Sequence, residues 1–443
     1  MQVSKKVMDG LSRREFLIMT SMAATSLAVG CATNPVTGKS QFMIMDEKQE
    51  IAIDRQYSPL QFSSDYGTVQ DRVLQGYVQT TGKRLAADTH RSQMPYNFHC
   101  VNANYVNAYA FPGGSIACTR GILLELENEA ELAALLGHEL GHVNARHTAA
   151  SMSKAQLANM AVGGLAVLTS VAVGSGAGNL AGQLGQLGSG ALLASYSRDN
   201  ERQADSLGMN YMTRSGYGPQ GMVGLMEMLN SMNQHRAGVT DLLFATHPMS
   251  SERYQTSVSQ ATTDYRQYEG QPLYRERYMD HTAGLRRIKG PIQLMQDGEG
   301  AMSKEQYSQA EGLFKQALAQ APDDYTGLLL MAKCQLVQKK DAEAERYVEQ
   351  AKRVYPEEAQ AYHISGITKI RNKKYDAAYE DFSIYDRRLP GNPNTVFYKG
   401  LSLEGMEKVE PAAREYNAYL KQVQEGKQAQ YAYQRLKEWG YIK

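Results

Sequence analysis

The sequence predicts an α+β domain followed by an all-α domain built from repeats. Short β-prone runs between residues 97 and 119 precede a segment rich in helix formers, Glu129–Val143. From Glu305 onward, small, aromatic and proline residues recur with one fixed period. With 443 residues, 42% of them hydrophobic, the chain is long enough to bury more than one core.

Charge and cysteine content exclude two classes of protein. The 47 Lys and Arg residues almost balance the 46 Asp and Glu residues, so we expect no nucleic-acid partner. Four scattered cysteines are too few for a disulfide framework or a cysteine-type zinc site. Cys100 and Cys118 can pair in an oxidising compartment, but we expect two independent buried thiols.

Residues 1–30 are predicted to be an export signal that takes no part in the fold. A basic start and the pair Arg13-Arg14 precede a mostly apolar run that stops at Cys31. This run is too short to span a bilayer stably, and paired arginines are typical of a twin-arginine signal. The alternative is a general secretory signal with coincidental arginines.

The segment Leu27-Ala28-Val29-Gly30-Cys31 resembles a bacterial lipobox, although its leucine lies one place earlier than usual. The resemblance implies that Cys31 becomes the mature N-terminus and carries lipid. The alternative is an unmodified cysteine near an ordinary cleavage site. Because one acyl chain binds membranes only marginally, stable anchoring requires the several chains of a bacterial lipoprotein. We expect a lipid-anchored protein of the bacterial cell envelope that faces the periplasm.

The predicted helix over Glu129–Val143 contains the pattern His138-Glu139-x-x-His142. The two histidines fall about one turn apart on one face, so their imidazoles can share a metal ion. Zinc binds neutral histidine, and a catalytic zinc site leaves one position for water. Glu139, next to the first ligand, can accept a proton from that water as general base. We therefore expect one Zn²⁺ per subunit.

No charged residue occurs between Lys154 and Arg198, and residues 160–173 are mostly apolar. This apolar run is shorter than the roughly twenty residues that a membrane helix requires, and glycines weaken an isolated helix. We expect a buried helix followed by a Gly-rich loop over the cleft.

A third zinc ligand is expected from residues 198–205. Glu201 and Asp205 lie four positions apart, so one carboxylate can bind zinc while the other lies on the same helix face. We predict that Glu201 is the ligand; the alternative is a surface charge near Arg198 and Arg202. Asp205 either accepts the free NH of a zinc-binding histidine or donates a proton during turnover, and we favour the first role.

The C-terminal part repeats every 34 residues, which is the tetratricopeptide period. Prolines end successive units, small residues let paired helices approach, and larger side chains fill the space between them. The aligned positions are Pro322, Pro356 and Pro390; Ala310, Ala344, Ala378 and Ala412; and Phe314, Val348, Phe382 and Tyr416. We expect repeats over residues 301–443 with a separate core and a concave groove that binds proteins or packs onto the first domain. Residues 254–300, rich in Tyr and Arg, are the expected junction.

Together, the motifs resemble one metallopeptidase family. His138 to His142, residues 144–147, and the pair Glu201 and Asp205 are similar to motifs of the CAAX prenyl endoproteases and HtpX. The chain looks like the secreted lipoprotein branch of this family, which carries C-terminal tetratricopeptide repeats. Residues 33–38 and 107–114 also look like family marks. The resemblance implies a zincin-like (gluzincin) peptidase domain over residues 31–253.

The same resemblance implies a substrate-binding strand. Residues 97–119 alternate β-prone runs with a Pro-Gly-Gly turn, as a small sheet beside the active helix would. In the proteins it resembles, the strand that matches residues 114–119 lies at the edge of the cleft. There it can pair with an extended substrate by β-augmentation. Its residues here would be Gly114, Ser115, Ile116 and Ala117; the alternative is an ordinary structural hairpin.

Thr246-His247-Pro248 resembles a segment placed close to the zinc in this family. His247 can bind the open metal position as a fourth ligand and so hold the enzyme inactive. It can instead hydrogen-bond to the oxyanion of the reaction, or only pack locally. We favour the gate, because the proline after His247 stiffens the loop and a protease with a backbone-reading cleft needs protection.

The sequence thus predicts a zinc-dependent endopeptidase, with Glu139 and Asp205 as its catalytic residues. Its substrates would be proteins of the envelope or outer membrane, cleaved during quality control or assembly. The alternative is a repeat-based chaperone or scaffold with a latent metal site. Glu139 argues against a purely structural site, which usually has four protein ligands and no base.

Overall fold

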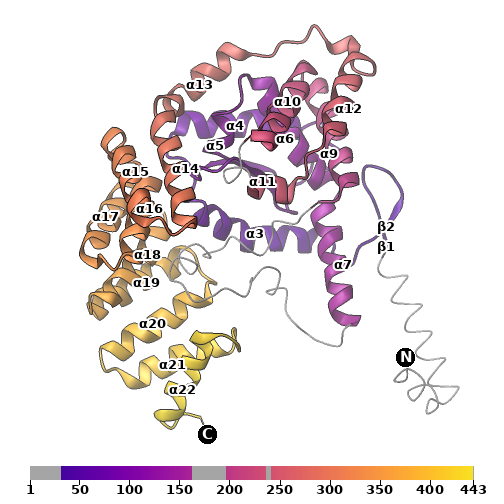
Figure 1. Cartoon of the computed structure of the whole chain (residues 1–443). Coiled ribbons are helices and arrows are strands. Elements are labelled where there is room, and N and C mark those ends of the chain that lie inside the picture. The colour runs from indigo at the N-terminus through magenta and orange to yellow at the C-terminus, as the bar shows by residue number, and fades with distance from the viewer. Residues whose placement is uncertain (1–30, 162–195, 236–240, 443) are drawn as a thin grey trace, which may run out of the picture.

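The computed structural model describes residues 31–161, 196–235 and 241–442. The predicted export signal and the Gly-rich loop lie outside these residues, as does most of the apolar run 160–173. Within the described ranges, no helix is both long and apolar enough to cross a membrane. Figure 1 shows the repeats, coloured orange to yellow, stacked along one side of the N-terminal part.

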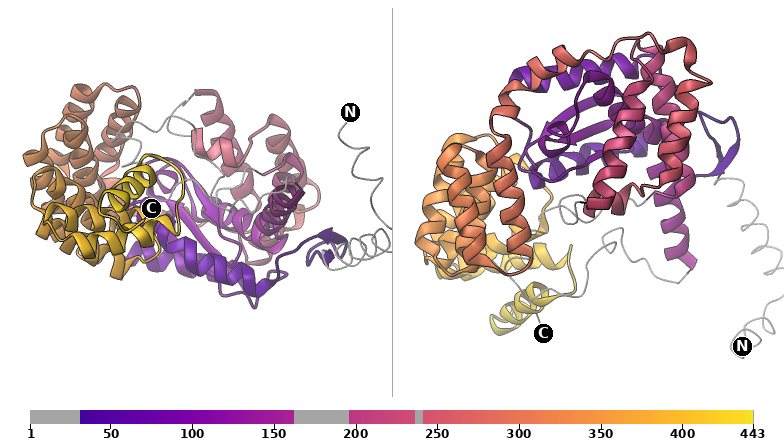
Figure 2. Two further views of the ribbon diagram at one scale, coloured as in Figure 1. Left: turned by 90° about the horizontal axis from the view of Figure 1, so that it is seen from below. Right: turned by 45° about the horizontal axis from the view of Figure 1, so that its top comes forward.

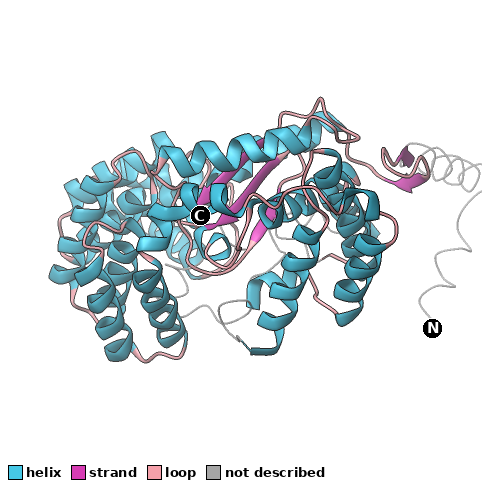
Figure 3. Ribbon diagram, turned by 90° about the horizontal axis from the view of Figure 1, so that it is seen from above, coloured by secondary structure: helices cyan, strands magenta, loops and turns pink. Residues whose placement is uncertain are grey.

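The N-terminal part is an α+β domain around a three-stranded sheet of order β3-β5-β4. Strands β3 (Asn97–Val101) and β5 (Ser115–Thr119) are parallel, and β4 (Ala108–Ala110) runs antiparallel to β5. Figure 3 shows the strands enclosed by helices. The surrounding helices are α3 (Glu47–Ser64), α4 (Arg72–Ala86), α5 (Arg120–Leu123), α6 (Glu129–Asn144), α7 (His147–Ala161), α9 (Arg198–Arg214), α10 (Gln220–His235), α11 (Asp241–Thr246) and α12 (Ser251–Thr262).

The predicted active helix is α6, and every residue of it is buried. Its first turn begins with the Asn128 side chain, which accepts a hydrogen bond from the Glu131 backbone NH. Helix α9 crosses α6 at close range because small residues meet at the contact. A methyl group on Gly137 would lie 3.1 Å from the Gly208 carbonyl oxygen, and one on Gly141 would lie 2.9 Å from the Ala204 Cα. This packing brings side chains of the two helices together.

The order of the sheet differs from the prediction for residues 114–119. Strand β5 pairs with β3 on one side and with β4 on the other, so it is the central strand. The backbone groups of Ser115, Ile116 and Ala117 already belong to these ladders, and the Gly114 carbonyl oxygen accepts a further hydrogen bond from the Asn97 backbone NH. The prediction of a substrate-pairing edge strand at Gly114, Ser115, Ile116 and Ala117 was therefore wrong.

A short hairpin begins at Cys31. Strand β1 (Cys31–Thr33) pairs with β2 (Ser40–Phe42), and the hairpin protrudes at the end of the molecule opposite the repeats (Figure 1). The buried Asn34 side chain closes the turn and also donates to the Ala145 carbonyl oxygen, at the end of α6. The hairpin is thus bonded directly to the end of the active helix.

Cys100 and Cys118 are register partners on β3 and β5. Both are buried free thiols, as is Cys334. Burial, reinforced by the neighbouring Cys118, raises the pKa of Cys100 well above its usual value. The expectation of buried thiols is met, although the two lie side by side.

The C-terminal part is a stack of paired helices. Residue 300, the expected end of the junction, falls inside α14 (Lys289–Ser303), which pairs with α15. The recurring alanines Ala310, Ala344, Ala378 and Ala412 are all fully buried. The junction itself contains α13 (Arg275–Arg287). The remaining helices are α15 (Tyr307–Gln320), α16 (Tyr325–Val337), α17 (Asp341–Val354), α18 (Gln360–Arg371), α19 (Tyr375–Arg388), α20 (Pro393–Gly405), α21 (Val409–Leu420) and α22 (Lys427–Glu438).

The expectation that the repeats form a separate core was wrong. One cluster of buried apolar side chains runs from Leu136 on α6 through Tyr278 on α13 and Met331 on α16 to Phe382 on α19. A second, smaller cluster holds only the last helices, from Phe397 to Leu436. The views in Figure 2 show the repeats curving around one end of the N-terminal part.

Buried polar contacts also join the two parts. The Arg120 guanidinium lies 2.7 Å from the Asp324 carboxylate, and both side chains are about 5% exposed or less. The Lys333 ammonium donates to the Tyr66 hydroxyl, and the Ser63 hydroxyl donates to Glu358. The inner face of the first repeats is therefore occupied by the N-terminal part.

Candidate functional site

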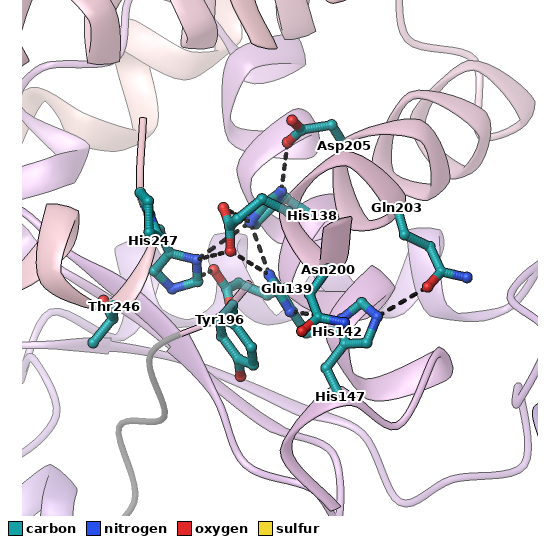
Figure 4. A network of polar contacts seen from close by, with 12 residues as sticks. His138, Glu139, His142, His147, Tyr196, Asn200, Gln203, Asp205, Thr246 and His247 are labelled. Atoms are coloured by element: carbon teal, nitrogen blue, oxygen red, sulfur yellow. Dashed lines mark hydrogen bonds and ion pairs between the residues drawn. The ribbon is translucent and has the colours of Figure 1, made fainter. Parts of the chain in front are cut away.

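Four predicted residues meet in one buried cluster. His138 and His142 project from one face of α6, and His247 follows α11 (Figure 4). Glu201 comes from α9. One ligand atom from each residue lies within 4.8 Å of the others. The sequence therefore identified all members of this cluster, including the loop histidine.

The cluster has the donor types and the spacing of a zinc site. The two Nε2 atoms of His138 and His142 lie 3.0 Å apart, and His142 Nε2 lies 3.3 Å from Glu201 Oε1. His247 Nδ1 lies 3.2 Å from Glu201 Oε1. Ligand atoms about 2.0–2.1 Å from a tetrahedral zinc ion lie roughly 3.3 Å from one another. Imidazole nitrogens with one carboxylate oxygen are a donor set that zinc prefers.

Burial and neighbouring groups keep His142 and Glu201 in the forms that bind a metal. Burial lowers the pKa of His142 well below its usual value, so its ring is neutral. Burial opposes the ionisation of Glu201, yet His247 and His142 beside it hold the pKa of Glu201 well below its usual value. A neutral ring and an ionised carboxylate are the ligand forms that zinc requires.

Glu139 lies beside the cluster without belonging to it. The side chain is 1% exposed, and Oε2 has no hydrogen-bond partner among the described residues. Its Oε1 lies 3.8 Å from His247 Nε2. A buried carboxylate oxygen without a donor is costly, so this position fits a group that accepts a proton from a water at the cluster.

Within the cluster, Asp205 contacts His138. His138 Nδ1 lies 2.9 Å from Asp205 Oδ1. Arg253 on α12 donates to both Asp205 oxygens at 2.7 Å, and its other terminal nitrogen lies 2.7 Å from Glu201 Oε2. Both oxygens of Asp205 are thus occupied, so the arrangement favours orientation of His138 over proton donation.

Arg253 was missed by the sequence reasoning. Its role depends on contacts with residues about fifty positions earlier, and only its place after His247 in a family-like segment pointed to it. It is 4% exposed, and a buried arginine near two carboxylates is the signal that was available.

Three further residues around His142 were also missed. Tyr196 stacks on the His142 ring with centroids 3.7 Å apart. His142 Nδ1 lies 3.0 Å from His147 Nδ1, and His147 Nε2 lies 3.0 Å from Gln203 Oε1. His147 belonged to the family-like motif, but no role had been assigned to it.

The free edge of the sheet beside α6 is β4. Among the described residues, β4 pairs with β5 on one side only, and it packs against α6. The preceding residue, Asn107, is fully buried, and neither polar atom of its side chain has a hydrogen-bond partner within the described ranges. The edge that the sequence assigned to residues 114–117 is therefore formed by residues 108–110.

Comparisons with known proteins agree with this geometry. The model of peptidase family M48 matches residues 73–260, and a tetratricopeptide repeat model matches residues 301–364. The chain is similar to the beta-barrel assembly-enhancing protease of Yersinia pestis, at 26% identity over 86% of this chain and 82% of that protein. The Escherichia coli (strain K12) protein of that name is 28% identical over 52% of this chain, which spans only 47% of it.

A shorter relative is similar over the peptidase part. Metalloprotease YcaL of Escherichia coli (strain K12) is 36% identical over 179 residues, which cover 39% of this chain and 67% of that protein. With these matches and a buried His-Glu cluster on α6 and α9, the chain belongs to peptidase family M48 and is a metalloprotease with C-terminal tetratricopeptide repeats.

Proposed function

We propose that this metalloprotease uses one Zn²⁺ per subunit to cleave proteins of the bacterial envelope during their quality control or assembly. The single observation that carries the proposal is the buried set of His138, His142 and Glu201 beside the unpartnered Glu139 oxygen. Zinc in such a site supplies Lewis acidity and a water of lowered pKa. Glu139 would be the general base that takes up the proton of the attacking water and returns it to the leaving amine. Asp205 and Arg253 hold His138 in position.

The substrate class rests on the named relatives. Two of them, from Yersinia pestis and Escherichia coli, are called beta-barrel assembly-enhancing proteases. We propose that the substrates here are likewise envelope or outer-membrane proteins. The last repeats, whose apolar cluster is separate from the main core, are the part of the stack that can hold a protein client. A repeat-based scaffold with an inactive metal site is not favoured, because Glu139 lies where a base is needed.

The Glu139→Gln variant, which should bind zinc without cleaving its substrates, tests this function. An inactive protease that still binds zinc should retain its clients, so cross-linking in cells followed by mass spectrometry should enrich envelope proteins over the wild type. A His138→Ala, Glu139→Gln double variant controls for binding that does not depend on the metal site. Enrichment of no envelope protein, or equal enrichment with the control, would contradict the proposed substrate class.

We propose β4 as the strand that pairs with an extended substrate, in place of β5. Its free edge lies beside the helix that carries the zinc ligands. Pairing along a strand edge uses backbone groups and reads few side chains. The unpartnered Asn107 amide, directly before β4, is suited to bond to the backbone of the same substrate.

His247 is proposed to be a gate. Its Nδ1 lies 3.4 Å from His138 Nε2 and 3.2 Å from Glu201 Oε1, within the donor cluster, which favours a fourth ligand over an oxyanion contact. A fourth protein ligand excludes the catalytic water. The segment is held from outside the cluster, since the Tyr196 backbone NH donates to the Thr246 carbonyl oxygen.

The His247→Ala variant is therefore expected to show several-fold higher basal proteolysis, measured with an unfolded protein such as casein. An oxyanion contact would instead make turnover fall by roughly a hundredfold or more. His281→Ala, a histidine outside the cluster, is the control. A rate equal to the wild type would mean that His247 only packs locally, and either of these two outcomes would reject the gate.

We also propose that Cys31 is the mature N-terminus, that it carries lipid, and that it anchors the periplasm-facing protein to a membrane. The lipobox-like residues 27–31 support the proposal. Mass spectrometry of the membrane fraction should find acyl chains on Cys31, and Cys31→Ser should move the protein to the soluble fraction. Cys334→Ser, which alters a buried thiol, is the control. An intact signal, or a Cys31→Ser protein that stays on the membrane, would contradict this.

A further inference from the structure

The two histidines of α6 that are proposed to bind zinc have different hydrogen-bond partners at Nδ1. His138 Nδ1 faces Asp205, a carboxylate that can only accept a hydrogen bond while it is ionised. His142 Nδ1 instead begins a row of uncharged groups that consists of His142, His147 and Gln203. His142 Nδ1 lies 3.0 Å from His147 Nδ1, and His147 Nε2 lies 3.0 Å from Gln203 Oε1. Figure 4 shows this row leading away from the cluster through His147 to Gln203.

The row fixes which nitrogen of His142 carries a hydrogen. A neutral imidazole has one NH donor and one acceptor nitrogen. When Gln203 presents its oxygen, His147 carries its hydrogen on Nε2 and accepts at Nδ1. His142 must then donate from Nδ1, which leaves the lone pair of its Nε2 free to bind a metal.

If the donors and acceptors along the row were reversed, His142 could not bind a metal ion through Nε2. If the side-chain amide of Gln203 turned over and presented its NH₂ group, His147 would have to donate from Nδ1. His142 would then accept at Nδ1 and carry a hydrogen on Nε2, which points at His138 and Glu201. The oxygen and the NH₂ group of an amide have nearly the same shape, so Gln203 can present either an acceptor or a donor to His147. An ionised carboxylate can present only an acceptor.

Both members of the row have the properties that this role requires. His147 is 4% exposed, and each of its two ring nitrogens lies within hydrogen-bonding distance of one partner, His142 or Gln203. Gln203 is only half-buried and lies on α9 between Glu201 and Asp205. Helix α9 thus supplies the carboxylate ligand, the partner of His138, and the end of the row behind His142.

We propose that His147 and Gln203 are positioning residues that set the metal-binding tautomer of His142 through a neutral hydrogen-bonded relay, with Gln203 as its adjustable end. This inference rests on the proposed zinc site. It makes the zinc affinity of the protein depend on a half-buried amide that does not belong to the group of candidate ligands. Partners of metal-binding histidines typically change metal affinity by about 10–100-fold when they are removed.

Zinc affinity of the full-length, metal-free protein tests the relay, measured by competition with a chelator at pH 8. Gln203→Met keeps the length of the side chain but removes the acceptor without a change of charge, and should weaken zinc binding about tenfold or more. Gln203→Glu, an acceptor only, should bind zinc at least as tightly as the wild type. Thermal unfolding of the metal-free variants checks that each remains folded.

A double-mutant cycle separates the relay from simple charge and packing effects. In a His147→Phe background the relay is cut, so Gln203→Met should have no further effect on zinc affinity. His147→Asn, whose amide oxygen can still accept from His142 Nδ1, should recover part of the affinity that His147→Phe loses. Wild-type affinity in Gln203→Met, or full additivity in the cycle, would overturn the proposal.

The ¹⁵N chemical shifts of the His142 ring in the metal-free protein report the tautomer directly. We expect a protonated Nδ1 in the wild type and in Gln203→Glu, and a mixture of tautomers in Gln203→Met. Because this readout needs no zinc, it decides the relay even if the protein proves to bind another metal. Identical shifts in the wild type and Gln203→Met would refute the relay and leave the proposed protease function untouched.

Discussion

Glu139→Gln is expected to bind zinc as the wild type does and to lose proteolysis by about a hundredfold to ten-thousandfold. The amide keeps the shape of the carboxylate but cannot accept a proton, and Glu139 is not part of the metal-binding cluster. Metal analysis and a casein-cleavage or self-cleavage assay measure the two quantities.

The matched control for this change is Glu127→Gln, which removes an exposed carboxylate just before the same helix. It should keep both zinc and activity. If Glu139→Gln retained activity, Glu139 would not be the base. If it lost zinc, the carboxylate would be a ligand and the proposed division of roles would fail.

Ending the chain at residue 288, before α14, is expected to leave a peptidase fragment that does not fold. The truncation removes Ile292 and Met295 from the continuous apolar cluster, together with all repeat side chains that complete it. It also removes Asp324, the buried partner of Arg120. The stabilising free energy lost with so much buried apolar surface exceeds the roughly 5–15 kcal/mol by which folded domains are stable. Soluble yield and circular dichroism measure the outcome.

A shorter truncation provides the control. Ending the chain at residue 389 removes α20 to α22, whose buried side chains belong mainly to the separate cluster. This protein should fold and melt cooperatively with zinc bound. A soluble, cooperatively melting fragment of residues 31–288 would show that the shared core is dispensable.

The sequence was sufficient for those parts of the site that depend on local spacing. His138 and His142 share a helix face because they lie four positions apart, and the same holds for Glu201 and Asp205. The residue types on these faces then determine the chemistry. No long-range information was needed to propose the metal ligands and the base.

The parts that failed depend on contacts between distant segments. A strand has the same alternating pattern at the centre of a sheet as at its edge, so β5 was mistaken for an edge strand. Arg253 and Gln203 are ordinary charged and polar helix residues until α9 and α12 bring them to the cluster. Lys333 and Asp324 are charged residues of the repeats, yet their side chains are buried against the first domain.

The β1–β2 hairpin gives the proposed lipid anchor an unusual mechanical property. Cys31 is the first residue of β1, and the same hairpin is bonded through Asn34 to the end of α6, so only this hairpin lies between the proposed anchor and α6 in the described residues. A lipid on Cys31 would therefore keep the active site at a nearly fixed distance from the bilayer. The protease would then sample only those polypeptides that come within this narrow layer, and proximity to the membrane would itself select its substrates.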